Sequence, residues 1–304
     1  MNLRIVFMGS PEFARIILEG LINSFQVVGA ISQPDRPSGR GRVLTAPPVK
    51  IFAMEKGLET IQPERLREPQ VMEKFNSWKP DVIVVAAFGQ ILRQNVLDLP
   101  PYGCINVHAS YLPRWRGAAP IQASILHGDP ETGVTIMKMD AGIDTGQIIQ
   151  QEKVKIESSD NSMTLSEKLA KTGSDLLIKT LPRYLDGLIS LKQQDESKAT
   201  YAGMLKKEEG FLDFSQTALE LDRRVRAFYP WPGTFMQFQD QPLKIHATHV
   251  VLQPALQSSR RSQIDGFPAV RTGDGWLVLD VVQPAGKKAM AGDVYLRGVH
   301  GWEE

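Results

Sequence analysis

An asparagine and a histidine at the end of an apolar run are the first residues whose types and spacing suggest chemistry. Asn106 and His108 alternate with Ile105 and Val107, so a strand here places both polar side chains on one face. A buried polar pair is costly, and ligands bind at the carboxyl ends of strands in open parallel sheets. A lone histidine is more often a hydrogen-bonded structural residue, but the nearby asparagine favours a site. Cys104, on the same run, has the character of a small buried hydrophobe.

Asp140 and Asp144 stand further along the chain in a loop that contains glycine, 139–146. Such loops often only turn, with Asp side chains that accept hydrogen bonds from backbone N–H groups. The functional alternative is that one of these two acids brings a carboxylate to the His108 site. An amide, an imidazole and a carboxylate can perform acyl transfer without a metal, because one stabilises the oxyanion, one moves protons and one orients the imidazole. No serine or cysteine stands out beside a suitable base, so we expect no covalent acyl-enzyme.

A second unusual stretch, 33–50, is rich in proline, glycine and cations. Its cationic residues are Arg36, Arg40, Arg42 and Lys50. The composition predicts neither a helix nor a central strand, and loops of this length in compact domains are usually functional or disordered. Two interpretations stay open: a loop that contacts RNA phosphates, and a solvated surface loop.

The first half of the chain has the repeated strand and helix pattern that could position these residues. An apolar run at 3–8 is followed by a turn at 9–14 and a helical stretch over 12–23. Further strands are predicted over 27–31, 81–87, 103–107 and 133–137. Apolar strands that alternate with helices imply a mostly parallel sheet covered on both faces, so we expect an α/β, Rossmann-like domain. The 9–14 segment lacks the GxGxxG spacing of dinucleotide sites. Its backbone N–H groups could hold an anion or the edge of a cofactor, and the alternative is a tight strand-to-helix turn.

The second half predicts a smaller β domain. A long amphipathic helix over 164–188 is followed by a polar stretch that is poor in apolar residues. Beyond it we expect a helix over 216–228 and strands over 235–238, 243–252, 269–271 and 276–282. Short strands with turn signals suggest a small barrel, and an OB-like barrel is one possibility. The predicted domains are 1–190 and 207–304, with a linker over 191–206.

Composition bounds the class of protein. The 304 residues are 42% hydrophobic, enough for two domains with cores, and the net charge is only +1. An RNA partner must therefore be met by local basic patches. The single cysteine permits neither an internal disulfide nor a cysteine-based zinc site, and it fits a reducing compartment. The first apolar run is too short for a signal peptide or a membrane span, so we expect a cytoplasmic protein with no membrane partner.

The chain resembles the methionyl-tRNA formyltransferases, within the wider group of enzymes that use 10-formyltetrahydrofolate. The resemblance spans nearly the whole chain and depends on segments 8–14, 33–50, 86–92, 106–121, 132–135, 140–146, 226–232 and 283–288. The strand with Asn106 and His108, together with the Asp144 loop, is typical of the wider group. The basic insertion at 33–50 and the carboxyl-terminal barrel are typical of the tRNA-directed member.

The resemblance implies an activity and a set of site residues. The co-substrate would be 10-formyltetrahydrofolate, with no metal, and the partner would be methionyl initiator tRNA. Asn106, His108 and Asp144 would form the catalytic trio. The folate site would be lined by two segments, Phe88, Gly89, Gln90, Ile91 and Leu92, and Ser110, Tyr111, Leu112 and Pro113. Family members commonly carry Leu at the position of Tyr111.

The tRNA contacts are expected from basic residues in both halves of the chain. These are Arg36, Arg40, Arg42, Lys206, Lys207, Lys287 and Lys288. Pairs of cationic residues are usually only solvated surface. We expect the protein to be a monomer.

Four other functions remain open from the sequence. A formyltransferase acting on a small amine, such as a nucleotide-sugar or a purine precursor, or a formyl-folate hydrolase, would carry the same trio. The basic loop and the barrel argue against both, because a small substrate needs neither. A dinucleotide oxidoreductase is disfavoured by the broken glycine pattern. A non-catalytic RNA-binding module is disfavoured because RNA binding does not require the three buried polar residues.

Overall fold

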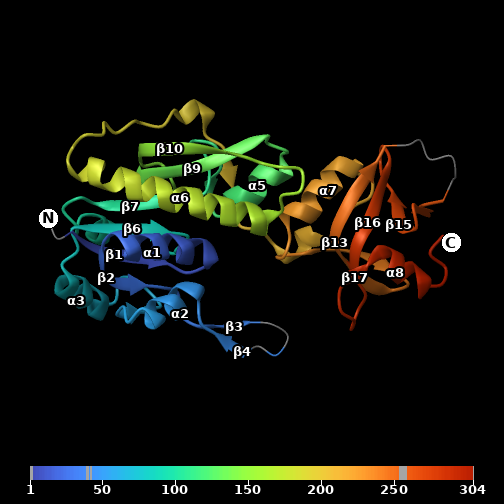
Figure 1. Ribbon diagram of the computed structural model, residues 1–304, viewed down its shortest axis with the longest axis horizontal. Helices are drawn as coiled ribbons and strands as arrows, with labels where there is room; N and C mark the ends of the chain where they lie inside the picture. The colour runs from blue at the N-terminus through green and yellow to red at the C-terminus, as the bar shows by residue number, and fades with distance from the viewer. Residues whose placement is uncertain (1–2, 39–40, 42, 253–258, 304) are drawn as a thin grey trace. The chain divides into compact units, whose positions relative to one another are not determined.

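The computed structural model describes residues 3–38, 41, 43–252 and 259–303, and it divides the chain into two compact units. Unit 1 comprises Met1–Pro120, Glu131–Lys155 and Ser166–Ala202, and unit 2 comprises Ile121–Pro130, Ile156–Leu165 and Gly203–Glu304. The two units are described separately (Figure 1).

Unit 1 is built on a seven-stranded sheet in the order β10-β9-β7-β6-β1-β2-β5. The pairs from β5 to β7 are parallel, whereas β9 runs antiparallel to both β7 and β10. The strands are β1 (Arg4–Gly9), β2 (Gln26–Ile31), β5 (Thr60–Ile61), β6 (Val82–Ala86), β7 (Cys104–His108), β9 (Glu131–Lys138) and β10 (Gln147–Lys155). This mostly parallel sheet confirms the predicted Rossmann-like domain.

Helices cover both faces of this sheet because its central strands are apolar on both sides. On one face, Val71, Phe75 and Trp78 pack with side chains of β1, β6 and β7. On the other, α6 lies so close that a Cβ on Gly173 would meet Val107 and Val134, and α1 and α6 lie along this face in Figure 1. The helices of unit 1 are α1 (Glu12–Ser24), α2 (Pro48–Glu55), α3 (Pro69–Trp78), α4 (Gln94–Leu97) and most of α6 (Ser162–Leu185), whereas α5 (Pro120–Leu126) falls almost wholly in unit 2.

Neighbouring atoms leave no room for a side chain in the turn between β1 and α1. A Cβ on Gly9 would lie 2.6 Å from the Cβ of Ala14 and 2.7 Å from the carbonyl oxygen of Ala86, closer than atoms can approach. The Oγ atom of Ser10 accepts a hydrogen bond from the backbone N–H of Gln33. Glycine is therefore needed here for close approach, as a tight strand-to-helix turn requires.

Segment 33–50 differs in part from its prediction. Two short strands, β3 (Arg36–Ser38) and β4 (Val43–Thr45), pair antiparallel within it. The expectation that no helix occurs in 33–50 is wrong at its end, because α2 begins at Pro48. A proline fits the first turn of a helix, where the missing N–H would have no intrahelical acceptor.

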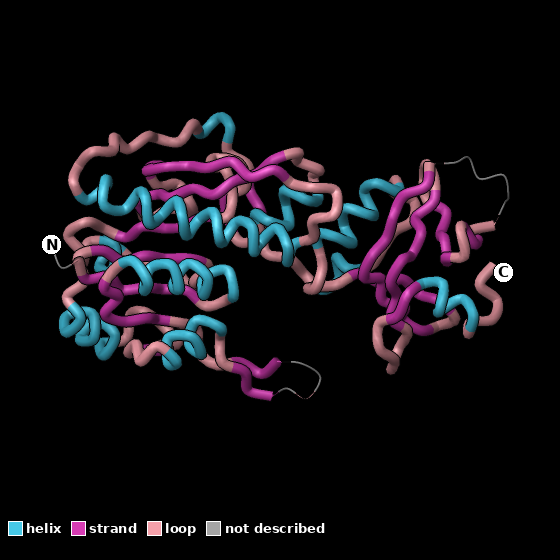
Figure 2. Tube along the Cα trace, in the orientation of Figure 1, coloured by secondary structure: helices cyan, strands magenta, loops and turns pink. Residues whose placement is uncertain are grey.

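Unit 2 is dominated by an antiparallel sheet in the order β12-β13-β16-β15-β14, with β17 on β16. The strands (magenta in Figure 2) are β12 (Thr234–Phe238), β13 (Gln241–Val251), β14 (Arg261–Ile264), β15 (Phe267–Arg271), β16 (Trp276–Gln283) and β17 (Met290–Ala291). Its helices are α7 (Ala218–Ala227) and α8 (Gly292–Arg297), and α7 begins with a capping box between Thr217 and Glu220. The prediction of a second, smaller β domain is confirmed.

The polar stretch after α6 lies against unit 1 as far as residue 202. Lys192 forms an isolated bridge with Ile148, and β11 (Tyr201–Ala202) pairs in parallel with β8 (Arg116–Gly117). Short 3-10 helices occur at Glu196–Lys198 and Lys207–Gly210. The domain and linker boundaries predicted above stay predictions. Within the described ranges, no helix is long and apolar enough to cross a membrane.

Candidate active site

The structure brings Asn106, His108 and Asp144 together at the end of β7. Asp144 Oδ1 lies 3.4 Å from the Nδ2 atom of Asn106, and Asp144 Oδ2 lies 3.6 Å from the Nδ1 atom of His108. Asn106 is 9% and His108 6% exposed. The pair shares one face of β7, as the alternation with apolar residues predicted, and the carboxylate arrives from the loop between β9 and β10.

The His108 ring is oriented by a backbone carbonyl as well as by the carboxylate. Its Nε2 atom lies 3.0 Å from the carbonyl oxygen of Trp115. A carbonyl only accepts hydrogen bonds, so this contact assigns a proton to Nε2. The other ring nitrogen, Nδ1, is the one that faces Asp144.

The two aspartates of the 139–146 loop differ in role: one stabilises the turn, and the other brings its carboxylate to the site. Asp140 turns the loop, because its Oδ1 atom accepts hydrogen bonds from the N–H of Gly142 and the hydroxyl of Thr145. Asp144 instead places its carboxylate at the site, where the N–H of Gly117 donates to Oδ2 over 2.8 Å. Its backbone has φ +53°, in the left-handed region that costs free energy for a residue with a Cβ.

The segment Ser110 to Pro113 is tied to the neighbouring strands. Thr135 on β9 donates through its hydroxyl to the carbonyl of Ser110, and the same hydroxyl accepts from the N–H of Leu112. Gln151 on β10 donates to the carbonyl of Leu112. Tyr111 is the exposed member, with the Nζ atom of Lys153 5.5 Å from its ring centre. These bonds fix the backbone that the resemblance assigns to the folate site.

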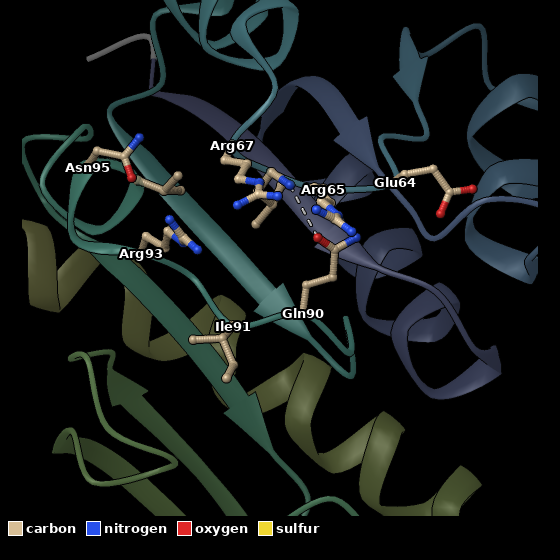
Figure 3. A pocket seen from close by; sticks show the side chains of 9 residues that line it. Glu64, Arg65, Arg67, Gln90, Ile91, Arg93 and Asn95 are labelled. Atoms are coloured by element: carbon tan, nitrogen blue, oxygen red, sulfur yellow. Dashed lines mark hydrogen bonds between the residues drawn. The ribbon is translucent and has the colours of Figure 1, made fainter.

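Some residues of the segment Phe88 to Leu92 pack in the core, and others line a cavity. Phe88 and Leu92 belong to the core beside α3, and Gly89 has φ +80°. Gln90 and Ile91 line a cavity of about 370 Å³ (Figure 3) together with Glu64, Arg65, Leu66, Arg67, Arg93, Asn95 and Val96. Gln90 is held there by a 3.3 Å hydrogen bond from the N–H of Leu66. The catalytic candidates do not line this cavity.

The cations expected to contact tRNA lie in both units. In unit 1, Arg36 is exposed on β3, with its Nη2 atom 3.8 Å from the carboxylate of Glu64. Lys50 instead pairs with Asp35, and this ion pair holds the pKa of Asp35 below its usual range. Arg40 and Arg42 lie outside the described residues. In unit 2, Lys206, Lys207, Lys287 and Lys288 are all exposed.

Several contacts of the site were not predicted from the sequence. The carbonyl of Trp115, the N–H of Gly117 and the hydroxyl of Thr135 hold site residues through backbone or long-range bonds. Residue types alone carry no signal for such bonds. Gln194, whose side-chain amide donates to the carbonyls of Asp144 and Gly146, lies in the stretch that was predicted to be a linker.

Other chemistry was also considered at the site. No group of three or more His, Cys, Asp or Glu side chains that could hold a metal ion occurs among the residues the structure describes. Cys104 is buried on β7, and burial raises the pKa of its thiol to about 12. A thiol that stays protonated is a poor nucleophile.

Comparison with known protein families defines the class. Residues 3–181 match the model of the formyl transferase family, and residues 204–300 match that of the formyl transferase C-terminal domain. A methionyl-tRNA formyltransferase of Bacillus subtilis is 46% identical over 98% of this chain and 95% of its own length. One of Chloroflexus aggregans is 43% identical over 98% of both chains. The chain belongs to the methionyl-tRNA formyltransferase family.

Solved structures share this fold at low sequence identity. WlaRD, a sugar 3N-formyl transferase solved with dTDP and 5-N-formyl-THF, matches 95% of this chain and all of its own with a TM-score of 0.68 at 17% identity. HypX from Aquifex aeolicus, solved with tetrahydrofolic acid, matches 98% of this chain and 47% of its own with a TM-score of 0.67 at 13% identity.

Proposed function

We propose that this protein transfers the formyl group of 10-formyltetrahydrofolate to the amino group of methionyl initiator tRNA. The observation that carries the proposal is the meeting of Asn106, His108 and Asp144 in a chain so similar to methionyl-tRNA formyltransferases. The product would be N-formylmethionyl-tRNA for translation initiation.

The residues present fit a folate co-substrate. The cavity beside Gln90 and Ile91, about 370 Å³, is within the range of about 300–1,000 Å³ that is usual for small ligands. Ile91 is 74% exposed and offers an apolar surface to a flat ring. When bound, the folate would supply a formyl group on N10 that an amine can attack.

Asn106 is suited to stabilise the oxyanion that develops on the formyl oxygen. Its Nδ2 atom lies 3.4 Å from Asp144, beyond the usual N–H···O range of about 2.7–3.2 Å. The Asp144 carboxylate therefore holds this amide only weakly, and its N–H can donate to the formyl oxygen as negative charge appears there. A donor placed before the reaction needs no reorganisation in the transition state.

His108 is suited to carry the proton from the amine to the leaving nitrogen. With one proton fixed on Nε2 by Trp115, its Nδ1 atom accepts the proton that the amine loses and then donates it to N10. The imidazolium present between these steps lies 3.6 Å from the carboxylate of Asp144, which stabilises it. An α-amino group has a pKa of about 7.7–8.0, lowered further by the ester of aminoacyl-tRNA, so no strong base is needed.

The proposed tRNA contacts are cationic residues of both units: Arg36, Arg40, Arg42, Lys206, Lys207, Lys287 and Lys288. Single-stranded and helical RNA both present phosphates that cations neutralise. The polypeptide would act as a monomer in the cytoplasm, with no membrane partner and no metal.

One assay tests this function against its rivals. The purified protein is incubated with 10-formyltetrahydrofolate and methionyl initiator tRNA, and N-formylmethionine is measured after hydrolysis of the ester. Parallel reactions contain an amino sugar nucleotide or no acceptor. Formylation of the sugar alone, or release of formate without formylmethionine, would overturn the proposal.

A further inference from the structure

A buried arginine that the mechanism above does not use lies next to the site. Arg116 is 0% exposed. Its guanidinium donates to Oε1 of Gln194 from Nε at 3.0 Å and from Nη2 at 2.9 Å, and to both carboxylate oxygens of Glu196 at 2.8 and 2.7 Å. A buried charge is tolerated only when it is paired and hydrogen-bonded. The exposed Glu196 supplies the pairing, and Arg116 holds the pKa of Glu196 below its usual range.

The Gln194 amide connects this arginine to the Asp144 loop. Its Nε2 atom donates to the carbonyl oxygens of Asp144 and Gly146, both at 2.8 Å. If the Gln194 amide were flipped, its N–H₂ group would face the N–H donors of Arg116 and its oxygen would face the two carbonyl oxygens. Neither contact could form a hydrogen bond. Arg116 therefore fixes the orientation of the Gln194 amide. In this orientation the amide bridges the backbone carbonyls of Asp144 and Gly146.

The Asp144 loop needs such support because its conformation is costly. A residue with a Cβ at φ +53° persists only where its surroundings hold it. Two adjacent residues of strand β8 stabilise the loop. The N–H of Gly117 donates directly to the Asp144 carboxylate, and Arg116 binds Gln194, which donates to the Asp144 backbone carbonyl. The strand is itself fixed by β11 and by the bond from the N–H of Arg116 to Thr200.

We propose that Arg116 and Gln194 are positioning residues for Asp144, so that the buried guanidinium sets the place of the carboxylate relative to His108 and Asn106. This inference rests on the proposed function, because it assumes that Asp144 acts in formyl transfer. The two residues touch no reacting atom, and their effect reaches the reaction only through the loop.

The test uses Gln194→Glu, which keeps an acceptor for Arg116 but sets a carboxylate oxygen against the carbonyls of Asp144 and Gly146. We expect kcat for formyl transfer to fall about 10- to 100-fold, with KM for folate and for tRNA changed by less than about 3-fold. The matched control is Gln193→Glu, the same change on the exposed preceding residue, which should leave kcat and KM unaltered. Thermal unfolding checks the fold of each variant, and Gln194→Ala replaces Gln194→Glu if that variant does not fold.

A double variant separates positioning from a general structural role. If Gln194 acts through Asp144, adding Gln194→Glu to Asp144→Asn should lower kcat by less than about 2-fold. Two outcomes would overturn the inference, provided that Asp144→Asn alone lowers kcat. One is that the decreases in kcat of the two single variants multiply in the double variant, and the other is a normal kcat in folded Gln194→Glu. Normal kcat in Asp144→Asn would instead overturn the catalytic assignment on which the inference rests.

Discussion

The backbone N–H of Gly117 donates a 2.8 Å hydrogen bond to the Oδ2 atom of Asp144. This oxygen also faces Nδ1 of His108, so a main-chain donor fixes the distance between carboxylate and imidazole. The loop that carries Asp144 is therefore anchored to the short strand β8, and the site depends on where that strand lies.

Substitution of Gly117 should disturb both stability and rate. Gly117 has φ +110°, and a Cβ there would lie 2.6 Å from the carbonyl oxygen of Ala202. We expect Gly117→Ala to lower the free energy of unfolding by about 1–3 kcal/mol and to lower kcat, because β8 must shift. The control is Gly57→Ala, which has φ +66° but no atom within 4 Å of the new Cβ. Urea unfolding and the formylation assay provide the readouts, and an equal decrease in stability in the two variants would contradict the role of the close approach.

Removal of the Asn106 amide should slow the reaction without unfolding the protein. If its N–H is aimed at the developing oxyanion, Asn106→Ala should lower kcat on the order of 10²-fold or more. Asn76→Ala, on the exposed surface of α3, is the matched control and should have normal kcat. Near-normal turnover by folded Asn106→Ala would reject the assigned role.

The thiol of Cys104 should be unreactive in the folded protein. Burial raises its pKa from 9.0 to about 12, so iodoacetamide at about pH 8 should label it only after unfolding. Mass spectrometry of native and urea-treated protein measures the label. Rapid labelling of the native protein would show that the strand opens.

The same pKa shift predicts a loss of stability at high pH. Above pH 9.0 the unfolded thiol releases its proton while the folded thiol keeps it up to about pH 12, so the unfolded state gains stability as pH rises between these values. Relative to Cys104→Ala, the wild type should lose about 1.4 kcal/mol of unfolding free energy from about pH 8 to about pH 10. A constant difference between the two proteins would contradict the raised pKa.

The lysines of unit 2 should contribute to the salt dependence of tRNA binding. Each phosphate that a cation no longer neutralises reduces the slope of log K against log salt by about 0.7–0.9. Lys206→Ala with Lys207→Ala should therefore flatten the slope by about 1–2 and weaken binding. Lys171→Ala with Lys179→Ala, on the exposed side of α6, is the control pair. An unchanged slope in the first pair would remove these lysines from the tRNA contacts.

The elements that the sequence predicted well are those with a strong local pattern. β7 is continuous, apolar and short, so its position and the shared face of Asn106 and His108 followed from the period of a strand. β10 was missed because only Ile148 and Ile149 are buried on it. Apart from Val154, the rest of this edge strand is polar or charged, and a half-exposed edge leaves a weak pattern.

The contacts that hold the site could not be predicted because they join distant parts of the chain. Arg116 and Gln194 are 78 residues apart, and no local spacing connects them. The Pro47 and Pro48 pair indicated a loop, yet Pro48 begins α2. A proline before a helix and a proline in a loop have the same local signature, and only the packing of the following turn distinguishes them.

Strand β9 runs opposite to β7 and pairs with it from Ile105↔Lys138 to His108↔Thr135. Its residues Thr132 to Val134 continue past the end of β7 and stay paired with β10. The β9–β10 pair thus continues beyond His108 as a hydrogen-bonded ribbon, so this edge of the site is built from paired strands and not from a loop.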